Sequence, residues 1–108
     1  MPIFIAKVML QEVKNEDIYS ELDQAMVAED GYPYITDENE TIFALPPDEY
    51  EFELDISAKE LLNICKLICA KIEKKHSLVK TPIIITEVKD LQYANLQELT
   101  DEDFETLN

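Results

Sequence analysis

Apart from many carboxylates, few side chains in this sequence could take part in acid–base, nucleophilic or metal chemistry. His76 is the only histidine, and it follows two lysines where a helix is expected to end. Because cations are favoured at the C-terminal end of a helix dipole, this placement needs no catalytic role. Cys65 and Cys69 lie four residues apart, and one histidine cannot complete a four-ligand zinc site with them. The sequence therefore identifies no catalytic residue and predicts neither a metal site nor a cofactor.

Charge is the most unusual property of the chain. Its 108 residues include 24 aspartates and glutamates but only 9 basic residues, all of them lysines, so the formal net charge is −15 at pH 7. A chain of this charge repels phosphate backbones at long range, which argues against nonspecific nucleic-acid binding. Residues 12–55 contain fifteen acids and one lysine, whereas residues 57–80 contain six lysines and two acids. We therefore expect an acidic side and a small basic side.

Two charged sets are candidate binding surfaces, although solvated faces and a dipole-matched helix end would have the same composition. If the protein contacts RNA, the expected phosphate contacts are Lys71, Lys74, Lys75 and His76. If it binds a basic protein, the expected acidic surface consists of Glu16, Asp17, Glu21, Asp23, Glu49, Glu51 and Glu53. Complementary charge would steer either partner to its surface.

Apolar periodicity indicates the elements that must position these groups. Period-two patterns predict a strand at residues 3–10 and a half-buried extended segment around residues 50–54. The β-branched run at residues 83–88 predicts a final strand buried on both faces, and we expect both strands to lie centrally in the sheet. Helical spacing from Ile18 to Met26 predicts a first helix. Ser57 and Glu60 form a capping box that begins a second helix.

The middle of the chain is expected to contain a stop signal and a hairpin. Gly31, the only glycine, would end the first helix in a left-handed conformation. Short apolar runs at residues 32–35 and 41–45 flank a polar turn in which Asn39 tolerates a positive φ. The order of elements predicts an α+β, ferredoxin-like βαββαβ two-layer sandwich over residues 1–90. Its helices would cover one face, and residues 91–108 would form an acidic, partly disordered C-terminal extension.

The chain carries no sign of export or membrane insertion. No apolar run approaches the roughly 20 residues that span a bilayer, and residues 1–10 lack the features of a secretory signal. The two cysteines are spaced as on one helical face, where disulfide geometry is rarely met. We therefore expect a cytoplasmic protein without a membrane partner.

Residues 45–50, Leu-Pro-Pro-Asp-Glu-Tyr, follow a helix that contains Tyr19 and Met26 and a turn at residues 30–32. With these features, over residues 3–88, the sequence resembles the GhoS family of antitoxins from type V toxin–antitoxin systems. The resemblance implies a ferredoxin-like fold related to the small CRISPR-associated endoribonucleases. It also implies a homodimer and cleavage of a toxin messenger RNA that depends on basic residues in the first helix.

This chain departs from the family pattern in that helix, where it has Glu21 and Asp23. Two main hypotheses follow. The first is a GhoS-like antitoxin or regulatory protein of a bacterium or mobile element, acting on a toxin messenger RNA as an endoribonuclease. The second is an acidic protein-binding module that inhibits a basic or nucleic-acid-binding partner by imitating nucleic acid. A structural partner subunit without activity of its own is a third alternative.

Overall fold

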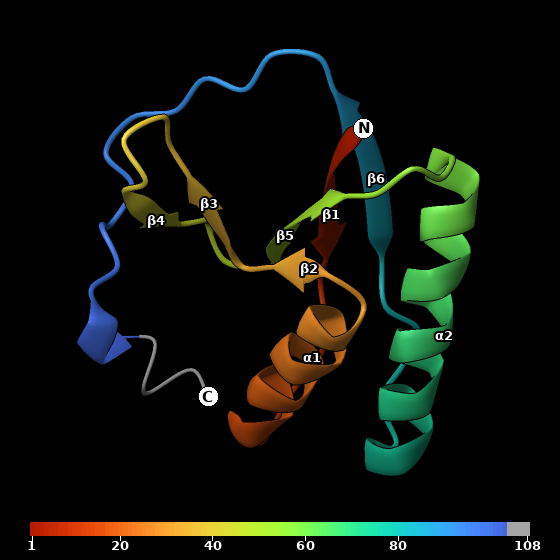
Figure 1. The fold of residues 1–108 in the computed structure, drawn as a ribbon. Helices are drawn as coiled ribbons and strands as arrows, with labels where there is room; N and C mark the ends of the chain where they lie inside the picture. Colours follow the sequence, from red (N-terminus) through yellow and green to blue (C-terminus); the bar gives the residue numbers. More distant parts are fainter. Residues whose placement is uncertain (104–108) are drawn as a thin grey trace.

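A four-stranded antiparallel sheet lies at the centre of the molecule, and two helices cover one of its faces (Figure 1). This computed structural model describes residues 1–103. Its central elements are β1 (Ile3–Val8), α1 (Asp17–Ala28), β2 (Gly31–Tyr32), β5 (Glu49–Glu53), α2 (Ala58–His76) and β6 (Ile83–Val88). The predicted α+β class is confirmed. Among the described residues, no helix has the length and apolar character needed to cross a bilayer.

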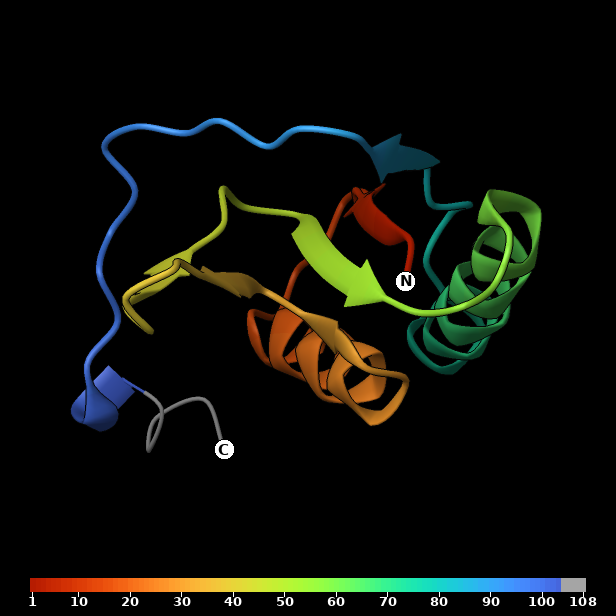
Figure 2. The same cartoon turned by 45° about the horizontal axis from the view of Figure 1, so that its top comes forward.

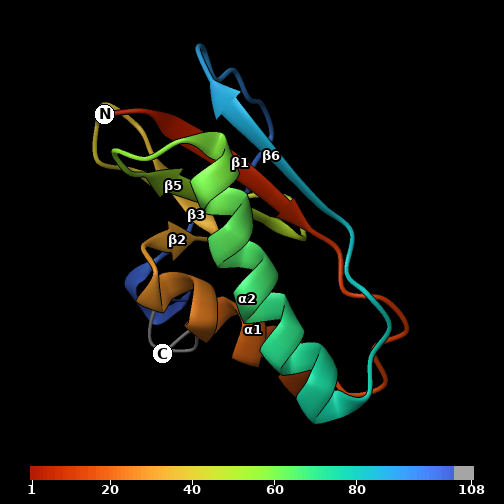
Figure 3. The same ribbon diagram turned by 90° about the vertical axis from the view of Figure 1, so that its right-hand side faces the viewer.

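The strands of this sheet follow the order β2-β5-β1-β6, and each neighbouring pair is antiparallel. Helix α1 connects β1 to β2, and α2 connects β5 to β6. Figure 3 views the molecule from the side of α2, which packs against β6 and lies next to α1. The two helices therefore share one layer, as predicted from the element order.

Alternation along β1 places every second side chain in the core. Phe4, Ala6 and Val8 are completely buried beneath the helices. The apolar stripe of α2 meets them with Leu61, Cys65, Cys69 and Ile72. At the start of α2, the amide of Glu60 donates a hydrogen bond to Ser57 Oγ over 3.1 Å, which confirms the predicted capping box. These features were predictable because each depends on residues within one strand or one helical turn.

The position of β6 differs from the prediction. We expected this strand in the middle of the sheet with both faces buried, but it is an edge strand that pairs with β1. Ile83 and Ile85 pack against the core, whereas Ile84 between them is 59% exposed. A run of β-branched residues suits a covered edge strand as well as a central one. The run alone therefore could not distinguish the two positions.

The predicted hairpin is confirmed and forms a separate two-stranded sheet from β3 (Tyr34–Thr36) and β4 (Ile42–Ala44). Its turn is held by Asp37, whose Oδ1 accepts hydrogen bonds from two backbone amides further along the turn. The positive φ of the turn falls on Glu40, at 63°, and not on Asn39. The side-chain bonds of Asp37 set the turn, so the residue after Asn39 takes the left-handed position.

Beyond β6, the chain crosses back over the molecule to the hairpin (Figure 2). The amide of Ala44 donates to the carbonyl of Gln97 over 2.8 Å, and the amide of Leu99 donates to that of Ile42 over 2.8 Å. Residues 97–99 therefore extend the small sheet on the open side of β4. The last part of the expected C-terminal extension, residues 104–108, lies outside the described residues.

Gly31 has a different role from the predicted left-handed helix stop. The residue with the positive φ is Asp30, at 66°, and Gly31 lies in β2 with an ordinary φ. There its backbone sits directly against the ring of Phe52, at a distance that leaves no room for a Cβ atom. The chain needs glycine here for a close approach between β2 and β5, not for backbone freedom.

Candidate functional site

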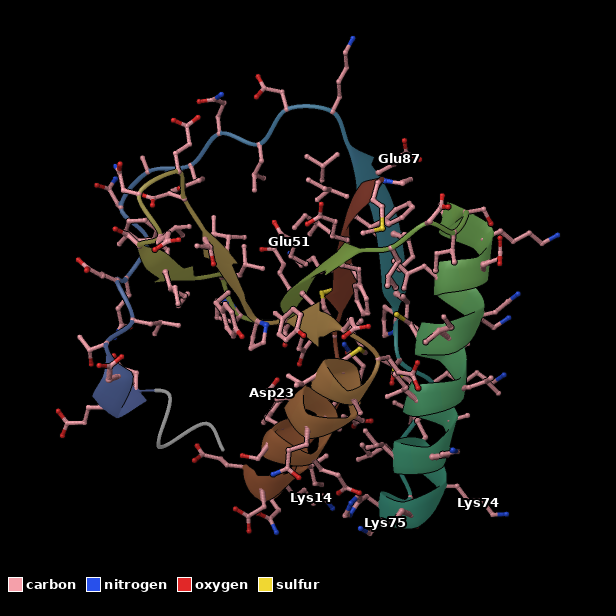
Figure 4. The ribbon with its side chains drawn as sticks, in the orientation of Figure 1. Lys14, Asp23, Glu51, Lys74, Lys75 and Glu87 are labelled. Atoms are coloured by element: carbon pink, nitrogen blue, oxygen red, sulfur yellow. The ribbon has the colours of Figure 1, made fainter. Side chains whose placement is uncertain are left out.

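The basic end of α2 is partly neutralised by α1. Glu21 of α1 lies 2.9 Å from Lys75 Nζ through Oε1 and 2.6 Å from His76 Nε2 through Oε2. In Figure 4, Lys75 lies at the ends of the two helices, and Lys74 points away from α1. Of the four predicted phosphate contacts, Lys75 and His76 are therefore paired with a carboxylate. This reduces the positive charge that the set can offer to RNA.

The Glu21 pairs also make a testable contribution to pH-dependent stability. Hydrogen bonds from Lys75 and then His76 lower the pKa of Glu21 below its ordinary value. A carboxylate with a lowered folded-state pKa stabilises the fold above its unfolded pKa, and that contribution is lost as the pH falls through the folded-state pKa. Lys75 is exposed, and Glu21 and His76 are only partly buried, so we expect the contribution to be small.

We therefore expect Glu21→Gln to lower the urea midpoint slightly at neutral pH. The difference from the parent should disappear as the pH falls through the lowered pKa of Glu21, because the parent carboxylate is then protonated as well. Glu16→Gln is the matched control, because Glu16 lies just before the same helix and its side chain makes no capping hydrogen bond there. If the urea midpoint of Glu21→Gln were lower than that of the parent by the same amount at every pH, the ion pairs would not be the cause of the difference.

Two residues further along α1, Asp23 contacts the sheet. Asp23 Oδ1 accepts a hydrogen bond of 2.5 Å from the hydroxyl of Tyr50 at the start of β5. Burial raises the pKa of Asp23, and the bond from Tyr50 opposes that rise. Burial also raises the pKa of Tyr50, and the carboxylate of Asp23 raises it further. The pair therefore holds a half-buried charge next to a neutral phenol at the junction of α1 and β5.

A hollow of about 420 Å³ opens beside this pair, between α1 and the segment that leads into β5. We call it the Asp23 pocket, and it is lined by Tyr19, Asp23, Pro33 and residues 45–50. A backbone hydrogen bond to β1 holds the rim of the pocket: the amide of Val8 donates to the carbonyl of Asp48 over 2.8 Å. Asp48 itself adopts a positive φ of 70°. The pocket combines apolar and aromatic walls with the carboxylates of Asp23, Asp48 and Glu49.

A second acidic feature continues from the pocket along β5. Alternate residues of this strand place the β5 glutamate row, which consists of Glu49, Glu51 and Glu53, on the sheet face opposite the helices. Burial raises the pKa of Glu51, and neighbouring Glu53 raises it further. Across the sheet the row pairs with Lys7, Ile5 and Ile3 of β1. Figure 4 shows Glu51 on β5 and Asp23 on α1.

The seven acids of the predicted acidic surface are thus divided. Asp23 and Glu49 line the Asp23 pocket, and the glutamate row continues from it. Glu21 instead faces α2, and Glu16 and Asp17 lie at the start of α1 and do not line the pocket. Sequence reasoning did not select Asp48, although it lies within the Leu-Pro-Pro-Asp-Glu-Tyr segment. Its position in the pocket depends on a left-handed backbone that no local pattern indicated.

Metal and thiol chemistry have no visible site in the described part of the chain. Among residues 1–103, no group of three or more histidine, cysteine, aspartate or glutamate side chains is arranged to hold a metal ion. Cys65 and Cys69 are buried in the core. Burial raises the pKa of Cys65 to about 12 and that of Cys69 to about 11. Both thiols are therefore protonated and enclosed at neutral pH, as core residues are.

No protein-family model matches this chain, and no curated protein matches it at a significant level. Of the seven acids of the predicted acidic surface, the Asp23 pocket and the β5 glutamate row together contain four, namely Asp23, Glu49, Glu51 and Glu53.

Proposed function

We propose that this protein is an acidic binding module that recognises a basic partner protein through the Asp23 pocket and the β5 glutamate row. The proposal rests on one observation: Glu49, at the start of β5, lines the Asp23 pocket and also begins the β5 glutamate row, so the two groups of carboxylates adjoin. Asp23 in the pocket and Glu51 in the row are both partly withdrawn from water. Burial disfavours the charged form of both carboxylates, and neighbouring Glu53 repels the charge of Glu51. A cation placed beside them relieves both effects, so binding a basic partner is favoured.

The net charge of −15 supports the same proposal. A strong negative potential accelerates encounter with a basic partner and repels nucleic acid. By imitating the charge of nucleic acid, the module would inhibit a partner that binds nucleic acid. The arrangement of β2-β5-β1-β6 with both helices on one face supports a ferredoxin-like framework for this surface.

A GhoS-like antitoxin that acts on a toxin messenger RNA is the second candidate function. It is favoured by the same strand order and by the placement of residues 45–50, the segment that carries the family resemblance, as one wall of a pocket. In that case the protein would act as a homodimer in the cytoplasm. Lys71 and Lys74 would supply the phosphate contacts, because Lys75 and His76 are paired with Glu21.

Binding of a basic peptide distinguishes the two candidates. The probe is a fluorescent peptide of five Arg-Ser repeats, and a labelled single-stranded RNA is the competing ligand. The row variant is the triple substitution Glu49→Gln, Glu51→Gln and Glu53→Gln. The control variant removes equal charge elsewhere with Glu12→Gln, Glu29→Gln and Glu38→Gln.

We expect the row variant to bind the peptide at least about tenfold more weakly and the control variant to lose less than about threefold. Binding to the parent should weaken steeply with salt, since exposed charges are screened. If the two variants lost affinity for the peptide equally, net charge alone would explain the loss, and the proposal would be contradicted. RNA binding or cleavage that disappears with Lys71→Ala and Lys74→Ala would favour the antitoxin instead.

A further inference from the structure

The Asp23 pocket has the size and shape of a specific binding site and not only of an acidic surface. Its volume of about 420 Å³ falls within the range of small-ligand pockets. Its walls come from elements that are distant in the sequence, α1 and residues 45–50. A hollow of this volume can receive a single side chain of a partner.

The rim of the pocket is already held in place. Pro46 and Pro47 restrict the backbone of the segment, and the amide of Leu45 donates to the carbonyl of Pro33 over 3.0 Å. Asp48 is tied to β1 through the amide of Val8. Little conformational entropy is left to lose when a ligand enters, which favours binding by a preformed site.

The walls of the pocket offer two different surfaces to a ligand. The ring of Tyr19, a residue that is 40% exposed, and the rings of Pro33 and Pro47 are apolar. Asp23 and Asp48 supply carboxylates to the same hollow. The bond from Tyr50 uses Oδ1 of Asp23 and leaves Oδ2 for an incoming donor. A ligand that fits must combine a flat, weakly hydrated surface with several donors.

Arginine has this combination and lysine does not. Its planar guanidinium stacks on aromatic rings and donates paired hydrogen bonds to carboxylates, whereas the lysine ammonium is a compact, strongly hydrated charge. From this match we infer that the Asp23 pocket receives an arginine side chain of the partner protein, with the guanidinium on Tyr19 and its donors directed to Asp23 and Asp48. This inference rests on the proposed function and adds the identity of the recognised residue.

The test compares two peptides of equal charge, the Arg-Ser probe and its Lys-Ser counterpart. For the parent protein we expect the arginine peptide to bind about three to tenfold more tightly, because only arginine gains the stacking and bidentate contacts. Tyr19→Ala should abolish this preference while retaining most of the binding to the lysine peptide. Asp48→Asn should also reduce the preference.

Tyr93→Ala is the matched control, since Tyr93 is a similarly exposed tyrosine, at 43%, that lies outside the pocket. It should leave the arginine preference unchanged. Equal affinity of the parent for the two peptides, or a preference that survives Tyr19→Ala, would overturn the inference. The proposed function would stand in that case if the row variant still lost binding, so the two failures are distinguishable.

Discussion

Gly31→Ala is expected to lower the free energy of unfolding by about 3 kcal/mol, near the upper end of the usual cost of overpacking a core. An alanine Cβ at this position would lie 2.5 Å from Cε1 and 2.7 Å from Cε2 of Phe52, and closer still to Cζ. Phe52 has no exposed surface, so its ring has no open space into which to move. Backbone strain contributes nothing, because Gly31 has no positive φ.

A double-mutant cycle separates this clash from other effects of the substitution. Phe52→Leu removes the ring that the new methyl group would meet, although it costs stability itself by leaving a cavity. Urea unfolding of the parent, the two single variants and the double variant then gives the coupling energy. We expect Gly31→Ala to cost much less in the Phe52→Leu background. The same cost in both backgrounds would refute the steric explanation.

Local patterns of the sequence were sufficient to predict most elements of this fold. The alternation in β1, the capping box of α2 and the hairpin around Asp37 each depend on residues a few positions apart. The sheet position of β6 was not predictable in this way, because an isoleucine-rich strand looks the same in the centre and at a covered edge. The role of Gly31 depends on Phe52, which lies far along the chain and on a different strand.

The candidate site shows the same division between local and long-range information. The lysines at the end of α2 lie close together in the sequence, within residues 71–75. Folding, however, brings Glu21 of α1 to Lys75 and His76 across more than fifty residues. The Asp23 pocket likewise needs α1 and residues 45–50 to meet. The excess of acids was readable from composition, but which carboxylates share a hollow depends on the packing of α1 against the sheet.

Tyr50→Phe is expected to lower the free energy of unfolding by about 2 kcal/mol at neutral pH, since it leaves a half-buried carboxylate without its donor. Phenylalanine keeps the shape of the tyrosine ring, so the core around it is not disturbed. Asp23→Asn should behave differently, because the amide oxygen still accepts from Tyr50 and the desolvated charge is gone. We expect its stability to equal or exceed that of the parent within about 0.5 kcal/mol.

The pH dependence of these variants identifies the charge as the cause. Burial raises the pKa of Asp23 in the folded state, so ionised Asp23 opposes folding above that pKa, and the opposition is relieved as the pH falls through it. The hydrogen bond from Tyr50 lowers the pKa of Asp23, so its loss raises that pKa further. The deficit of Tyr50→Phe should therefore be largest at neutral pH and shrink on acidification.

The double variant Asp23→Asn with Tyr50→Phe completes the test. With no carboxylate at position 23, Tyr50→Phe leaves only a neutral amide without its hydrogen-bond donor. An unpaired amide costs less stability than an unpaired charge. The effect of Tyr50→Phe in this background should be smaller than in the parent and independent of pH in urea unfolding. An undiminished loss would show that the hydroxyl of Tyr50 stabilises the fold independently of a charge at position 23. A diminished one means that the hydroxyl of Tyr50 is what allows a carboxylate to remain charged at the wall of the pocket, where a basic partner would meet it.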